Sequence, residues 1–153
     1  MDMEELRRQH ADVMAIAAQL GAAVADDRTP QSVGALRWRL ARRLLAHLAI
    51  EDDHLYPAML QLDDASARAT AKRFQTELGA LSAAFTHYMA AWTDLQIAEE
   101  WPRFCAETRI ILAALAKRVA QENTKLYPLA PPGWGAHARL LAPRAIGDRA
   151  AAF

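Results

Sequence analysis

One short segment occurs twice in this chain, and the copies differ at the positions that decide its chemistry. The first copy, residues 47–57, reads HLAIEDDHLYP, and the second, residues 118–128, reads RVAQENTKLYP. Both copies keep the glutamate and the final Leu-Tyr-Pro, whereas the two histidines of the first become arginine and lysine in the second. An internal repeat of this kind indicates one structural unit that the fold uses twice.

The spacing within the first copy predicts a metal half-site on a helix. His47 and Glu51 are four residues apart, so their side chains lie one above the other on the same helical face and can reach one ion. The second copy keeps the carboxylate as Glu122 but places Arg118 where the imidazole would be. Whether the protein binds metal depends on this difference.

Composition excludes several classes of function. Lys plus Arg and Asp plus Glu both total 18, so a chain of 153 residues has no net charge to attract nucleic acid or an anionic membrane. The length indicates one domain. With Cys105 as the single cysteine, no internal disulfide can form, which favours a cytoplasmic location. The acidic first residues do not resemble a signal peptide, and no apolar stretch is long enough to span a bilayer.

Periodicity predicts an all-α, up-and-down four-helix bundle over residues 1–128, followed by an irregular tail over 129–153 that can include a short helix at 136–141. The helices are expected from about 2 to 25, from 31 or 32 onward, after an N-cap at Asp63 or Asp64, and from about 101. The stripes expected to face the interior include Leu6, His10, Val13 and Leu20; Leu40, Leu44, His47, Glu51 and His54; Phe74, Leu78, Phe85, Tyr88, Trp92 and Leu95; and Phe104, Thr108, Ile111, Arg118, Glu122 and Lys125.

Four of these polar residues are expected to meet in one layer. In an antiparallel hairpin, residues equally far from the turn lie at the same level, which places His10 beside His47 and brings Glu122 to the level of Glu51. Buried carboxylates need partners. Either a cation such as iron, manganese or zinc binds all four side chains, or the guanidinium of Arg118 bridges the two glutamates.

The chain resembles the hemerythrin-like, or HHE cation-binding, family over roughly residues 3–130. The family pattern has one His on helix one, His-x-x-x-Glu on helix two, one His on helix three and His-x-x-x-Glu on helix four. The segment Leu6-Arg-Arg-Gln-His10 is similar to the first motif, and His47-x-x-x-Glu51 with Leu-Tyr-Pro to the second. At the other two positions Leu78 and Arg118 replace histidine.

The resemblance implies a non-haem iron site with a reduced ligand set. The ligands carried over are His10, His47, Glu51 and Glu122, with His54 or Glu77 as supplements. Two missing histidines favour one iron over a diiron pair, and the expected role is to bind or sense oxygen or another small diatomic molecule. The sequence contains no nucleophile constellation and no phosphate loop, so an enzyme is the weaker hypothesis.

A second hypothesis needs no metal. Arg118 and Lys125 would neutralise the glutamates, and the protein would act as an interaction or regulatory module through its aromatic surface or its tail. The tryptophans are also compatible with a homodimer. Tyr56 and Tyr127, which recur in the repeat, are expected to lock the helix ends through bonded hydroxyls.

Overall fold

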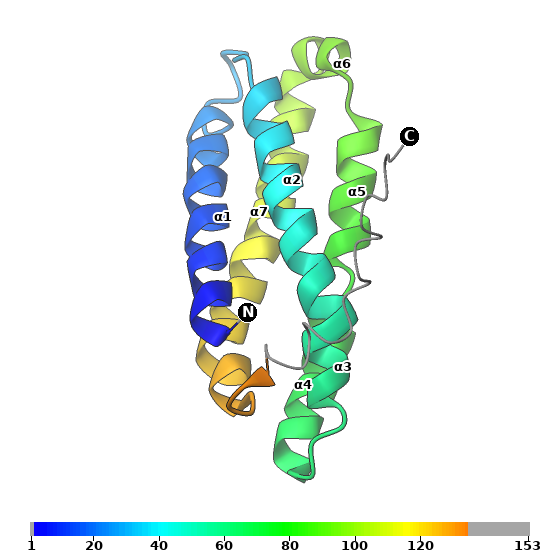
Figure 1. Ribbon diagram of the computed structural model, residues 1–153. Coiled ribbons are helices and arrows are strands. Elements are labelled where there is room, and N and C mark those ends of the chain that lie inside the picture. The colour runs from blue at the N-terminus through cyan, green and yellow to red at the C-terminus, as the bar shows by residue number, and fades with distance from the viewer. Residues whose placement is uncertain (1, 135–153) are drawn as a thin grey trace, which may run out of the picture.

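A computed structural model describes residues 2–134 (Figure 1). The expected helix at 136–141 lies outside the described residues. Five helices form most of the fold: α1 (Met3–Ala23), α2 (Gly34–Ile50), α4 (Ala65–Leu78), α5 (Leu81–Ala91) and α7 (Trp101–Gln121). Shorter elements join or extend them: η1 (Glu51–Leu55), α3 (Tyr56–Met59), α6 (Asp94–Glu99), η2 (Glu122–Leu126) and η3 (Tyr127–Leu129).

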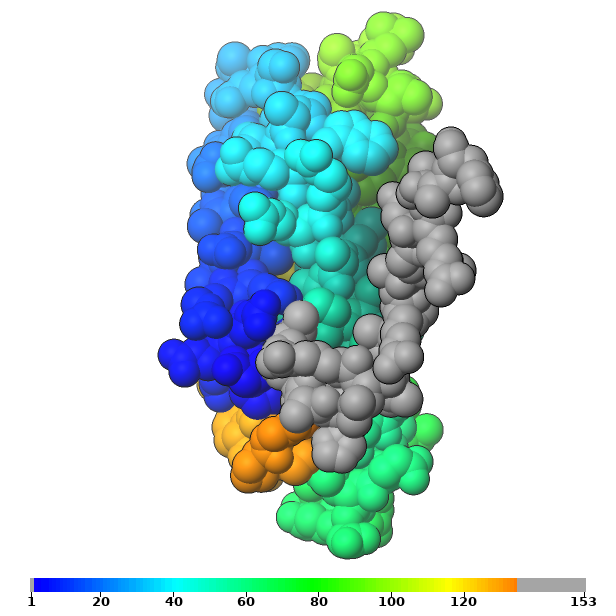
Figure 2. Space-filling model, in the orientation of Figure 1, coloured from blue at the N-terminus to red at the C-terminus, as the bar shows by residue number. Residues whose placement is uncertain are grey.

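The long helices form the predicted four-helix bundle. Helix α1 packs against α2 and α7, and α5 packs against the same two neighbours on the other side. The chain runs up and down through these helices, with the α1–α2 loop and α6 at one end and α3, α4 and η2 toward the other (Figure 1). In the space-filling view the surfaces of α1 and α2 adjoin along one face (Figure 2). No helix in the described range could cross a membrane.

Local signals explain most helix ends. The carboxylate of Asp64 accepts hydrogen bonds from the backbone N–H groups of Ser66 and Ala67, as the expected N-cap does. Helix α7 begins at Trp101 with proline in its first turn, also as expected. Two boundaries differ from the expectation by two or three residues: α1 ends at Ala23 and not near residue 25, and α2 begins at Gly34 and not at residue 31 or 32.

The third helix is divided, contrary to the expectation of one continuous stripe from Phe74 to Leu95. The division falls at Gly79, where a side-chain Cβ would collide with the carbonyl oxygen of Gln75. Only glycine fits this close approach. A further turn before α6 places Leu95 in solvent, with 67 % of its surface exposed, so its expected burial was wrong.

Each copy of the repeat contains a π-helical turn, at η1 and η2. A proline follows each turn, at Pro57 and Pro128; its ring would collide with the preceding turn of an α-helix, and the wider turn relieves that collision. The extra residue rotates the positions that follow. His54 is therefore only partly buried and Lys125 is exposed, so neither continues the interior stripe that the α-helical period predicted.

Two apolar clusters fill the bundle above and below the polar layer. One, around Leu20, Leu44 and Phe104, occupies the half nearer α6. The other, around Leu6, Phe74 and Leu126, occupies the half nearer α3 and α4, and includes Trp134. The polar layer is therefore closed off from solvent at both ends.

The bundle core predicts a clear contrast between two leucines. Leu44→Ala should lower the free energy of unfolding by about 2–5 kcal/mol, because it leaves a cavity in a fully buried position. Leu95→Ala should change it by less than about 0.5 kcal/mol, because that side chain is exposed. Urea unfolding followed by circular dichroism measures both, and equal losses would contradict this assignment of the core.

Candidate metal centre

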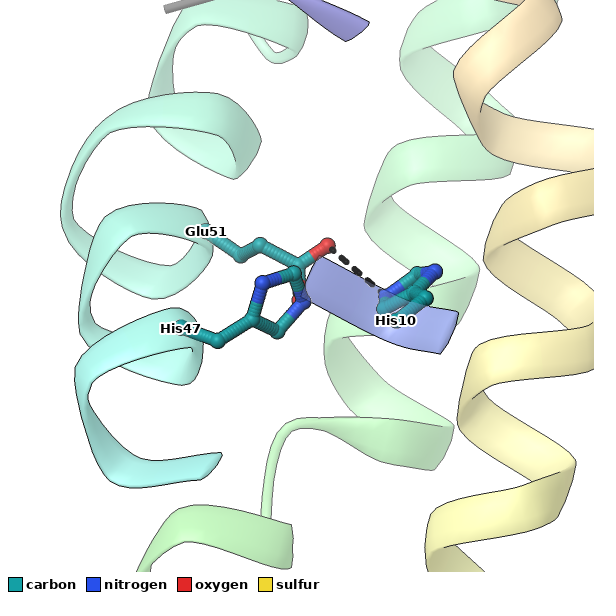
Figure 3. A group of neighbouring side chains, drawn as sticks. All are labelled: His10, His47 and Glu51. Carbon is teal, nitrogen blue, oxygen red and sulfur yellow. Dashed lines mark ion pairs between the residues drawn. The ribbon is translucent and has the colours of Figure 1, made fainter. Parts of the chain in front are cut away.

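Five ionisable side chains from three helical segments meet at the middle of the bundle. Helix α1 supplies His10, and the end of α2 with η1 supplies His47 and Glu51, which point toward one another (Figure 3). The end of α7 with η2 supplies Arg118 and Glu122. None of the five is more than 3 % exposed. Such burial is costly for charged groups and demands mutual compensation.

His47 and Glu51 face each other in a way that a hydrogen bond does not explain. Nδ1 of His47 donates to the amide oxygen of Gln9 over 2.8 Å, so in the neutral ring Nε2 carries the lone pair. That Nε2 lies 2.8 Å from Oε1 of Glu51, yet it is buried without a hydrogen-bond partner. Two lone pairs at this separation need a positive charge between them, either a proton on Nε2 or a metal ion. Two ligand atoms at adjacent positions around one ion are about 3 Å apart when each bond is about 2.1 Å.

His10 is held in the matching orientation. Its Nδ1 donates to the amide oxygen of Asn123 over 2.8 Å, which directs Nε2 inward. Nε2 then lies 3.0 Å from the hydroxyl of Tyr127, with which it shares a hydrogen bond, 3.6 Å from Oε1 of Glu122 and 4.0 Å from Oε2 of Glu51. Its ring is 4.6 Å from that of His47. One nitrogen from each histidine and one oxygen of Glu51 all lie within 4.8 Å of one another.

Arg118 fills the other half of the layer. Its Nε donates to Oε2 of Glu122 over 3.2 Å, and its Nη2 to Oε1 of Glu51 over 3.5 Å and to Asp52 over 2.7 Å. Its Nη1 donates over 3.4 Å to the carbonyl of Leu78, beside the break in the third helix. The guanidinium thus bridges the two glutamates. Where the family pattern has a histidine on the third helix, this chain offers a backbone oxygen to Arg118.

The two tyrosines of the repeat exchange partners across the layer. The hydroxyl of Tyr56, in the first copy, donates to Oε2 of Glu122 over 2.8 Å. The hydroxyl of Tyr127, in the second copy, donates to Oε2 of Glu51 over 2.7 Å. Burial, followed by the nearby carboxylates, raises the pKa of both phenols, so they remain hydrogen-bond donors. Each copy therefore steadies the carboxylate of the other, and Oε1 of Glu122 remains buried without a hydrogen bond.

The pKa values follow from these contacts. Burial alone would raise the pKa of Glu51, but His47 and the nearby cationic groups outweigh it and lower the pKa to about 2. Burial and the charge of Glu51 raise the pKa of Glu122. Burial alone would lower the pKa of His10, but the two carboxylates and the amide of Asn123 outweigh it and raise the pKa. The two carboxylates therefore favour a positive charge on His10.

Charge and donor chemistry together fit one divalent ion. Arg118 supplies one positive charge against three carboxylates, Glu51, Asp52 and Glu122, which leaves two negative charges to be compensated. The atoms without hydrogen bonds, Nε2 of His47 and Oε1 of Glu122, are both of the kinds that bind transition metals. The residues present therefore fit a single ion held by imidazole and carboxylate. They do not fit two ions, because Arg118 occupies the second half.

The remaining candidates lie outside this group. His54 and Glu77 are not among the three residues that the structure gathers within ligand distance, and Glu77 is exposed. Lys125 forms no ion pair with either glutamate, so the expectation that it neutralises them was wrong. The reason is the π turn, which directs Lys125 outward.

Sequence reasoning did not identify Gln9 and Asn123 as the residues that orient the histidines. Gln9 precedes His10 in the sequence, and Asn123 follows Glu122. An amide beside an interior position has no sequence pattern that predicts which histidine it binds. It also did not identify Asp52 as the partner of Arg118.

Comparison with known proteins identifies the family of the chain. A search of curated proteins and of solved structures found no match. A family model, described as the hemerythrin HHE cation binding domain, matches residues 1–130 and so covers the whole bundle and every residue of the centre. The match covers most of the chain, so the chain belongs to the hemerythrin HHE cation-binding family.

Proposed function

We propose that this protein binds one non-haem iron ion and uses it to bind or sense oxygen or another small diatomic molecule. The observation that carries the proposal is the pair formed by Nε2 of His47 and Oε1 of Glu51, 2.8 Å apart without a hydrogen bond. The family match supports a cation as the partner of these atoms.

The donor set supports iron among the possible metals. His10, His47 and Glu51 supply two imidazoles and one carboxylate, a combination typical of non-haem Fe(II) sites that keep open positions. Glu122 stands beside them, 3.6 Å from His10. When bound, the iron would supply an electron-rich centre at which a small ligand can attach. With few protein donors, positions remain for that ligand.

The surrounding residues would orient the donors and keep out water. Gln9 and Asn123 hold the two imidazoles with Nε2 facing inward. Tyr56 and Tyr127 each hold one carboxylate oxygen, which limits the rotation of Glu122 and Glu51. The apolar clusters on both sides exclude bulk water, which strengthens every electrostatic interaction in the layer.

The arrangement of Arg118 supports a second candidate function, a metal-free interaction module. Its guanidinium already contacts both glutamates, and protonated His10 could supply the remaining positive charge. The exposed Trp38, with 59 % of its surface accessible, would then belong to a partner surface. Metal content distinguishes the two functions.

The amount of iron that the protein retains should depend on the residues of the polar layer and not on histidines elsewhere in the chain. After anaerobic addition of ferrous iron and desalting, the wild-type chain should retain about one ion per chain, as its single set of ligands implies. His47→Ala and Glu51→Ala should retain almost none, because each removes one member of the compact group. Elemental analysis measures the iron-to-protein ratio.

His87→Ala is the matched control, because His87 is exposed on α5. It should retain as much iron as the wild-type chain. Full stoichiometry in both layer variants, or no iron in the wild-type chain, would exclude the proposed iron site and favour the interaction module.

Removing the charge of Arg118 should destabilise the metal-free fold and make stability depend on metal. Arg118→Met keeps much of the side-chain volume but leaves two buried carboxylates uncompensated, at a cost of about 3–5 kcal/mol. A divalent cation should restore part of this loss by binding the folded chain alone. Urea unfolding with and without ferrous iron measures the effect.

Lys125→Met provides the control for loss of a cation at an exposed position of the same repeat. It should change stability by less than about 0.5 kcal/mol. An Arg118→Met variant whose stability does not respond to metal would count against the iron site and in favour of the metal-free module.

Metal affinity should fall as the solution becomes acidic. The pKa of His10 is raised, so at a pH below that value the ion must displace a proton from Nε2 before the imidazole can bind it. Release of one proton per ion weakens binding by about tenfold per pH unit in this range. Competition with a metal-chelating dye at pH 5.5, 6.5 and 8 measures the slope, and affinity independent of pH would contradict the role of His10 as a ligand.

A further inference from the structure

A second arginine is buried in the bundle, remote from the candidate metal centre. Arg37 lies in the first turn of α2 and is 1 % exposed. It precedes His47 on the same helix by about ten residues, which corresponds to about 15 Å of helix. The apolar cluster around Leu20, Leu44 and Phe104 separates the two sites. Arg37 therefore has no part in the iron site.

Arg37 lacks the partners that a buried cation requires. Its Nη1 donates to the carbonyl of Trp92 over 3.5 Å, which is a long hydrogen bond, and its Nε and Nη2 have none. Burial raises the pKa of the Tyr88 phenol overall, although the guanidinium lies near that hydroxyl and acts to lower the pKa. Within residues 2–134, no carboxylate lies within 4.0 Å of the guanidinium. The nearby Glu107 is engaged elsewhere, because it accepts a hydrogen bond from Nε1 of Trp92 over 2.8 Å. Arg118, by contrast, contacts three carboxylates.

The aromatic neighbours of Arg37 compensate only part of its charge. The guanidinium carbon lies 5.0 Å from the ring centroid of Tyr88 and 5.5 Å from that of Phe104. Ring faces attract a cation, but they accept no hydrogen bond in the guanidinium plane. Water at Nε and Nη2 would satisfy the hydrogen bonds and leave a full positive charge in an apolar interior. An anion would satisfy both requirements.

The two unpartnered nitrogens define the shape of what binds. Nε and Nη2 lie on one edge of the planar guanidinium, and their N–H bonds point the same way, which is the edge that chelates anions. Tyr88, whose ring packs against the guanidinium, shares a hydrogen bond of 2.7 Å between its hydroxyl and that of Thr108, so one of these two hydroxyl groups still has a proton to donate. We propose that the chelating edge of Arg37 holds a small monovalent anion, either a halide such as chloride or a planar oxyanion such as nitrate.

Thermal unfolding of the full-length chain tests the site. The melting temperature should be higher in sodium chloride or sodium nitrate than in sodium gluconate of equal ionic strength, because gluconate is too large to enter. A rise of about 3 °C corresponds to an anion present well above its dissociation constant. Arg39→Met, which removes an exposed arginine of the same helix, should keep this rise, and Arg37→Met should lose it.

Crystals grown in sodium bromide give a second measurement, which applies even if Arg37→Met does not fold. Bromide should appear by anomalous scattering within hydrogen-bonding reach of Nε and Nη2 in the wild-type chain. A larger rise in nitrate than in chloride would identify an oxyanion site, and the reverse a halide site. Water at both nitrogens in those crystals, or an equal chloride response in Arg37→Met and Arg39→Met, would overturn the proposal.

Discussion

The repulsion between two buried carboxylates, Glu51 and Glu122, governs the middle of this bundle. Both side chains are fully buried, and two negative charges in an apolar interior are stable only when cations and hydrogen-bond donors surround them. The chain meets this demand with Arg118 and with one phenol hydroxyl for each carboxylate. The inward-facing imidazoles complete the set, either by carrying a proton or by binding a metal ion. Burial of the glutamates thus explains why the layer is so rich in polar contacts.

The repeat explains how these groups are placed, and its asymmetry explains the chemistry. The pseudo-twofold relation carries each Leu-Tyr-Pro across the layer, so each tyrosine reaches the glutamate of the other copy. Replacement of one histidine by Arg118 breaks the relation within the buried layer. One half keeps imidazole nitrogens that can bind an ion, and the other half contains a cation that cannot leave. Asp52 contacts that cation from the partly exposed side, so one guanidinium faces three carboxylates and two negative charges remain to be compensated.

The level of the site along the bundle could be predicted from the sequence, because antiparallel helices keep residues equally far from a turn side by side. The structure brings His10, His47 and Glu51 together as this reasoning expected. The direction in which the later side chains point could not be predicted, because the expectation assumed an α-helical period through both copies of the repeat. The π turns change that period, so that His54 and Lys125 turn away and the tyrosines turn inward. A proline indicates that a helix is disturbed, but it does not specify a wider turn rather than a kink.

The two buried arginines show that one bundle can compensate an interior cation in two ways. Arg118 is compensated by carboxylates of the chain itself, so its position is part of the fold and responds to whatever occupies the metal half. Arg37 has no carboxylate partner and depends on aromatic faces and on what the solution supplies. The apolar layers around Leu20 and Leu44 lie between them, and charges separated by that distance interact weakly once each is compensated locally. A metal ion at the middle of the bundle and an anion at Arg37 should therefore stabilise the same fold independently, because the two sites share no residue.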